Sequence, residues 1–97
     1  LLTEDQIAAA GLEGWRDEDK ALVASYSTGD FATGLRMVNA VGEAAEAADH
    51  HPDLTLTYPS VRVLLTSHDV GGITQRDLDL AARVGEIAAG LDVAVDQ

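Results

Sequence analysis

The sequence predicts one α+β domain over residues 1–97, with an antiparallel sheet and helices packed on one of its faces. A chain of 97 residues has the length of a single domain. Two β-rich segments joined by Pro59-Ser60 indicate a hairpin, which makes the sheet antiparallel. Two longer segments carry apolar residues at spacings of three and four, which is typical of helices with one buried face.

The N-terminal part of the chain predicts a short helix followed by strands. Thr3 and Gln6 have the spacing of a capping box, in which each side chain bonds the backbone N–H of the other. The helix should end at Gly11, because glycine readily takes a left-handed conformation. Asp17-Glu18-Asp19 has the composition of a charged turn, and Ala21–Ser27 is predicted to be the strand after it.

A long amphipathic helix is predicted over residues 31–48. Its apolar residues fall on one face, at Phe31, Leu35, Val38 and Val41. The loop before it runs from Ser27 to Asp30 and contains Gly29. Pro52 disfavours helical backbone at the residue before it, so the helix should end near Asp49 or His50.

The second half of the chain predicts the hairpin and a last helix. Leu54–Tyr58 alternates with period two and Val61–Leu65 is rich in β-formers, so these segments form two strands. After a loop, Thr74 and Asp77 have capping-box spacing and begin a helix. The acidic tail over residues 92–97 is expected to fray. The complete order is α-β-β-α-β-β-α, which makes a four-stranded antiparallel sheet.

Composition and charge exclude several classes of function. Seventeen Asp and Glu against six Lys and Arg give a net charge of −11, so neither a nucleic acid nor an anionic membrane surface is an expected partner. Cysteine is absent, which removes disulfides, thiolate zinc sites and iron–sulfur ligation, and agrees with a reducing compartment. No apolar run approaches the roughly 20 residues that span a bilayer.

All three histidines lie beside turns, and the hairpin is expected to bring them together. His50 and His51 precede its first strand, and His68 follows its second strand. With the turn near residue 59, the three imidazoles gather at one rim of the sheet. Because an imidazole titrates near neutral pH, such a cluster suits proton transfer, with one ring accepting a proton while another donates one. Asp77, in the first turn of the last helix, is placed to fold back toward this rim.

Simpler interpretations stand beside this one. A histidine pair next to a proline turn is often only solvated, and Asp77 has the position of an ordinary helix cap. A metal site is disfavoured, because adjacent histidines rarely share one ion and no His-x-x-x-His pair exists. Thr66 and Ser67 are most simply strand-end residues, since no Gly-x-Ser-x-Gly nucleophile motif is present.

Several motifs together resemble the pterin-4a-carbinolamine dehydratase family. They are Asp49-His50-His51-Pro52, an aromatic residue at Tyr58, the third histidine in His68-Asp69, Gly72-Ile73-Thr74, and Asp77. Gly14-Trp15 and the helix start at Asp30-Phe31 also look like the family, so the resemblance covers nearly the whole chain. It implies an α+β fold with a four-stranded antiparallel sheet and helices on one face. One departure is Asp53-Leu54, where many relatives carry a bulky aromatic residue.

The resemblance implies an activity, the dehydration of 4a-hydroxytetrahydropterin to quinonoid dihydropterin. This reaction recycles the pterin cofactor of aromatic amino-acid hydroxylases, and it needs no metal or other cofactor. Carried over by position, the catalytic residues are His50, His51, His68 and Asp77. His50 and His68 would be the acid/base pair, His51 would assist, and Asp77 would orient His68 or another imidazole. The residues implied at the pterin edge are Asp49, Thr66 and Ser67.

The resemblance also implies an alternative function and an oligomer. Some dehydratase-like relatives act as partner proteins, either as a dimerisation cofactor of a homeodomain transcription factor or as a Rubisco assembly chaperone. The three histidines and Asp77 favour the enzyme, while the strong acidity leaves the partner-protein alternative open. A sheet edge and an alanine-rich helix face predict a homodimer or homotetramer. We expect a cytoplasmic protein whose small-molecule partner is a pterin.

Overall fold

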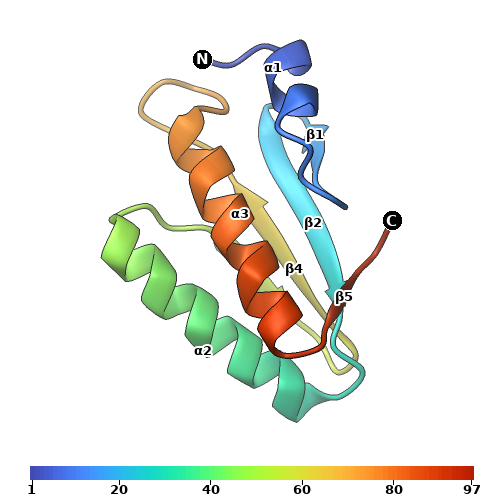
Figure 1. Cartoon of the computed structure of the whole chain (residues 1–97). Helices are drawn as coiled ribbons and strands as arrows, with labels where there is room; N and C mark the ends of the chain where they lie inside the picture. Colours follow the sequence, from blue (N-terminus) through green and yellow to red (C-terminus); the bar gives the residue numbers. More distant parts are fainter.

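The computed structural model describes all 97 residues and confirms the α+β class (Figure 1). Its elements are, in chain order, α1 (Glu4–Ala9), β1 (Arg16–Glu18), β2 (Ala21–Ser27), α2 (Phe31–Ala48), β3 (Asp53–Leu56), β4 (Ser60–Leu65), α3 (Gln75–Gly90) and β5 (Ala94–Val95). This is the predicted order of helices and strands, with the short strand β5 added at the end. None of the helices combines the length and the apolar surface that a bilayer crossing requires.

The sheet is antiparallel throughout, with β2 and β4 at its centre. The strand order is β1-β2-β4-β3, and β5 pairs with one end of β2. In the β3–β4 hairpin, Leu56 pairs with Val61 and Asp53 pairs with Leu64. The residues just before β3 and just after β4 therefore lie at the same end of the hairpin, as the sequence predicted for the histidines.

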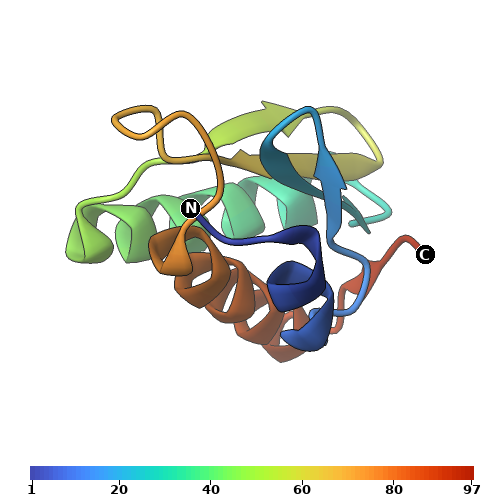
Figure 2. The ribbon, with the colours of Figure 1, turned by 90° about the horizontal axis from the view of Figure 1, so that it is seen from above.

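The helices α2 and α3 lie side by side against one face of the sheet (Figure 2). Alternation along β4 directs Val61, Val63 and Leu65 into the core and leaves Arg62 exposed on the other face. Large side chains from the rest of the chain that are fully buried in this core include Leu22, Tyr26, Met37, Val41 and Val84. Burial of this apolar layer is the main force that holds the helices on the sheet.

Local signals start and end α2 where the sequence placed its ends. The Asp30 carboxylate accepts a hydrogen bond from the Thr33 N–H at 2.7 Å and so caps the first turn. At the other end Asp49 takes a left-handed conformation, with φ 51° and ψ 41°. Pro52 follows within one turn, so the helix cannot continue.

Two predictions about short segments were wrong. Asp17 and Glu18 are not in a turn but in strand β1, and the turn lies at Asp19 and Lys20, which have φ of 52° and 65°. The tail does not fray, because the Asp96 N–H donates to the Ser25 carbonyl at 2.8 Å beside β5. Both segments are edge strands, three residues long in β1 and two in β5, and they are held by pairing with β2, so neither is long enough to show a strand pattern of its own.

Candidate active site

The site begins where α2 ends. The left-handed turn at the exposed Asp49 redirects the chain, and the next two side chains take opposite directions. His50 is buried, with 9% of its surface exposed, whereas His51 is exposed. The hairpin alone does not separate these two histidines; the packing of the α2 end against α3 does.

His50 is paired with the fully buried carboxylate of Asp77. His50 Nε2 lies 2.5 Å from Asp77 Oδ1. The second oxygen, Oδ2, accepts hydrogen bonds from the Ser67 hydroxyl at 2.8 Å and from the Thr74 N–H at 2.9 Å. A carboxylate in the interior is tolerated only when it is paired and hydrogen-bonded, and these three partners satisfy that need. Asp77 thus caps α3, as predicted, and also orients an imidazole.

This pairing determines which nitrogen of His50 is available. An ionised carboxylate only accepts hydrogen bonds, so the imidazole proton stays on Nε2 and the free nitrogen is Nδ1. In the neutral ring Nδ1 holds a lone pair and takes a proton, and in the protonated ring it gives one. His50 also lines a groove of about 420 Å³ between α2 and α3, together with small residues of α2 and with Arg76 and Arg83 of α3.

The loop that carries His68 is held beside this pair. Its two ends meet at the Ser67 N–H, which donates to the Gly72 carbonyl at 2.9 Å. Arg76 Nη2 donates to Asp69 Oδ1 at 2.6 Å, which joins the loop to the first turn of α3. This bond lowers the pKa of Asp69 and raises the pKa of Arg76, and the nearby imidazole of His50 adds a smaller lowering effect on Asp69. The ion pair therefore keeps the loop close to His50.

The other predicted site residues have separate surroundings. His51 bonds Glu46 on the surface of α2. His68 is exposed, and its ring makes no hydrogen bond to another side chain. The Thr66 hydroxyl donates to the Lys20 carbonyl at 2.9 Å. Direct contacts thus join His50 to Asp77 and Asp77 to Ser67, and no side-chain hydrogen bond joins the remaining predicted residues to these three.

Sequence reasoning missed the supporting contacts of the site. Glu46 precedes His51 by five residues, and this spacing is the only sequence signal of their bond. Arg76 and Asp69 are seven positions apart across a loop, and no sequence motif indicates their ion pair. Nowhere in the chain are three His, Asp or Glu side chains arranged to hold a metal ion.

Comparison with known proteins identifies the family. A family model described as pterin 4 alpha carbinolamine dehydratase matches residues 1–87. The chain belongs to this family. A relative from Koribacter versatilis is 45% identical over 84 residues, which are 87% of this chain and 89% of the relative. One from Thermomicrobium roseum is 45% identical over 78 residues, 80% of this chain and 84% of the relative. The names of both provisionally assign them as pterin-4-alpha-carbinolamine dehydratases.

Two solved structures share the dehydratase fold. A protein from Brucella melitensis, described as a transcriptional coactivator/pterin dehydratase, superposes with a TM-score of 0.83 at 33% identity over 90% of this chain and 97% of its own. A pterin dehydratase-like protein described as a RuBisCO assembly factor in the alpha-carboxysome gives a TM-score of 0.63 at 19% identity, over 76% of this chain and 86% of its own. The second likeness concerns the fold alone.

Proposed function

We propose that the protein dehydrates 4a-hydroxytetrahydropterin to quinonoid dihydropterin and water. The observation that carries the proposal is the buried His50–Asp77 pair, which leaves His50 Nδ1 as the free nitrogen of an oriented imidazole. A buried imidazole that is oriented by a carboxylate, lines a groove and keeps one nitrogen free is suited to proton transfer. Membership of the pterin-4a-carbinolamine dehydratase family supports the choice of substrate.

The reaction needs one acid and one base. The C4a–O bond breaks, and the hydroxyl leaves as water after it receives a proton. N5 loses its proton, and the electron pair of that N–H bond forms the C4a=N5 double bond. Nothing is oxidised or reduced overall. In the proposal His50 Nδ1 is one of the two proton-transfer groups and His68 is the other, and the roles are interchangeable because each imidazole can give or take a proton.

The remaining residues have supporting roles in the proposal. Asp77 orients His50, and Ser67, which is 1% exposed, holds Asp77 through its hydroxyl. The Asp69–Arg76 ion pair keeps the loop of His68 near His50. Assistance by His51, and contacts of Asp49, Thr66 and Ser67 with the pterin edge, stay predictions. So do the homodimer or homotetramer, the lack of a nucleic-acid partner, and the cytoplasmic location.

Turnover of enzymatically generated 4a-hydroxytetrahydropterin, followed by ultraviolet absorbance, tests the proposal. The informative variant is His50→Gln, because the glutamine amide reaches the position of Nε2 and keeps the bond to Asp77 but has nothing at Nδ1. We expect His50→Gln and His68→Ala to fold and to lose about 10²–10⁴-fold in turnover, the usual contribution of a positioned proton-transfer group. Glu86→Gln, an exposed change on α3, is the control and should keep the parent's turnover.

Two outcomes would contradict the proposal. If the folded parent chain does not accelerate the loss of the carbinolamine, the dehydratase activity is absent, and co-purification of a stoichiometric client would then favour the partner-protein alternative. If the parent is active and His50→Gln retains that activity, the assignment of Nδ1 is wrong.

A further inference from the structure

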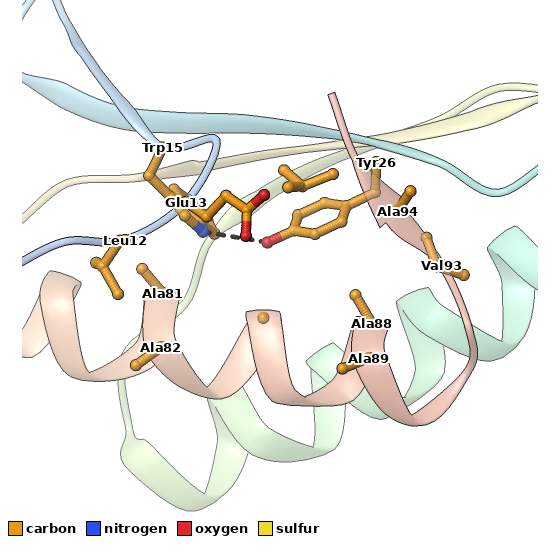
Figure 3. Close-up of a pocket in the computed structure, with 12 residues that line it drawn as sticks. Leu12, Glu13, Trp15, Tyr26, Ala81, Ala82, Ala88, Ala89, Val93 and Ala94 are labelled. Carbon is orange, nitrogen blue, oxygen red and sulfur yellow. Dashed lines mark hydrogen bonds between the residues drawn. The ribbon is translucent and has the colours of Figure 1, made fainter. Parts of the chain in front are cut away.

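A second cavity lies where α3 meets the segment before β1 and the strand β5 (Figure 3). Its volume of about 410 Å³ is within the usual range of small-molecule sites, roughly 300–1,000 Å³. It shares no residue with the groove beside His50. Part of its wall comes from Ala88, Ala89 and the segment Val93–Val95, which follow the residues matched by the family model.

The cavity exists because one wall is made of small residues. α3 contributes only alanines and Gly85 to it, so this face of the helix leaves space below the sheet. Trp15 and Tyr26 form an opposite, aromatic wall, with ring centroids 6.3 Å apart and ring planes at 66°. At one end of the cavity the backbone of Gly14 lies close to the Val95 side chain. Gly14 has φ 81°, and a Cβ at this position would lie 2.2 Å from a methyl group of Val95.

The polar groups of the cavity favour a cation. Glu13 is the only charged residue among those that line it, and no basic side chain is present there. Its Oε1 accepts a hydrogen bond from Gln97 at 2.7 Å, which leaves Oε2 available. The Tyr26 hydroxyl oxygen accepts from Trp15 Nε1 at 3.1 Å, and burial raises the pKa of Tyr26, so this phenol stays neutral and the Glu13 carboxylate is the only charge in the cavity wall.

We propose that this cavity binds an organic monocation with an apolar body, of the size of an arylalkylamine. The ammonium group lies beside the exposed Glu13 and the half-buried ring of Trp15, an arrangement that attracts cations through both the carboxylate and the ring quadrupole. The apolar body packs against the alanine face of α3. The net charge of −11 raises the local concentration of cations and repels anions.

Fluorescence of the full-length chain tests this proposal directly, because Trp15 is the only tryptophan and lines the cavity. Three probes of similar shape separate charge from apolar packing: 2-phenylethylamine, 2-phenylethanol and 3-phenylpropionate. We expect the amine to give a saturable change in Trp15 fluorescence. The alcohol should bind about fivefold more weakly, which is the usual effect of losing a partly exposed ion pair, and the anion should not bind. Equal affinity for the amine and the alcohol would overturn the assignment of a cationic ligand.

Two variants locate the binding. Gly85→Leu should abolish it, since a Cβ at Gly85 meets nothing within 4 Å and the longer side chain extends into the cavity. Glu13→Gln, an exposed and isosteric change, should lower the affinity for the amine to that for the alcohol. Neither variant should alter turnover of the pterin, because the cavity and the His50 groove share no residue. An unchanged response to the amine in Gly85→Leu would show that the probe binds elsewhere and would overturn the proposal.

Discussion

Replacement of Asp77 by Asn tests how the buried carboxylate controls His50. The amide has the size of the carboxylate but lacks its charge and carries an NH₂ group. The Thr74 N–H and the Ser67 hydroxyl both need an acceptor, so the amide oxygen stays at the position of Oδ2. The NH₂ group then faces His50 Nε2, which can pair with it only as an acceptor. The imidazole proton therefore moves to Nδ1, and the free nitrogen loses its lone pair.

The expected magnitudes follow from these contacts. Loss of a positioned proton-transfer group lowers turnover by about 10²–10⁴-fold. The three hydrogen bonds to the charged Asp77 carboxylate, each worth about 1.5–3 kcal/mol, become neutral bonds of about 0.5–1.5 kcal/mol. A neutral amide costs less to bury than a carboxylate, so the net fall in the free energy of unfolding is about 1–3 kcal/mol. Ser67→Ala is the matched control. It removes one hydrogen bond of the same carboxylate and a similar amount of stability, but it leaves the His50–Asp77 bond and most of the turnover intact.

Two measurements on each variant check the argument, namely pterin turnover by ultraviolet absorbance and the free energy of unfolding from urea titration. The reasoning about the tautomer is refuted if Asp77→Asn is destabilised but keeps the parent's turnover. It is also refuted if Ser67→Ala loses as much turnover as Asp77→Asn, because the effect would then follow stability rather than the orientation of His50.

Three further changes test the fold by urea denaturation. Gly14→Ala should lower the free energy of unfolding by about 1–3 kcal/mol, because φ is 81° and the new methyl group would collide with Val95. Gly42→Ala should raise it by about 0.5–1 kcal/mol, since Gly42 is inside α2 and a Cβ there meets nothing within 4 Å; a loss of stability would contradict this. The hydrogen bond from the Thr33 N–H holds the pKa of Asp30 below its usual 3.8. Above pH 3.8 this carboxylate therefore contributes its full stabilisation of the fold. That stabilisation is lost as the pH falls through the lower pKa of the folded state. Asparagine also caps a helix but does not titrate, so the parent should lose more stability on acidification than Asp30→Asn does. If the free energies of unfolding of the two proteins fall in parallel with pH, the effect is excluded.

Predictions from the sequence succeeded where the signal is local. The limits of β2 and α2 agree with the structure because apolar spacing, the cap at Asp30 and the effect of Pro52 all act within a few residues. The strand β5 was missed, and the residues of β1 were taken for a turn although a strand was expected before β2, because each is a very short edge strand held by pairing with β2.

The candidate site shows the same division between features with a local sequence signal and features set by tertiary packing. The sequence by itself determined the family resemblance, the place of all three histidines beside turns, and the position of Asp77 in the first turn of a helix. Only the tertiary structure decided that Asp77 faces His50 and that His51 points to solvent toward Glu46. It also decided that Trp15 and Tyr26 line a cavity over α3. The physical reason is that short-range patterns encode backbone conformation, whereas a side-chain pair depends on how α2, α3 and the sheet pack against one another across distant parts of the chain.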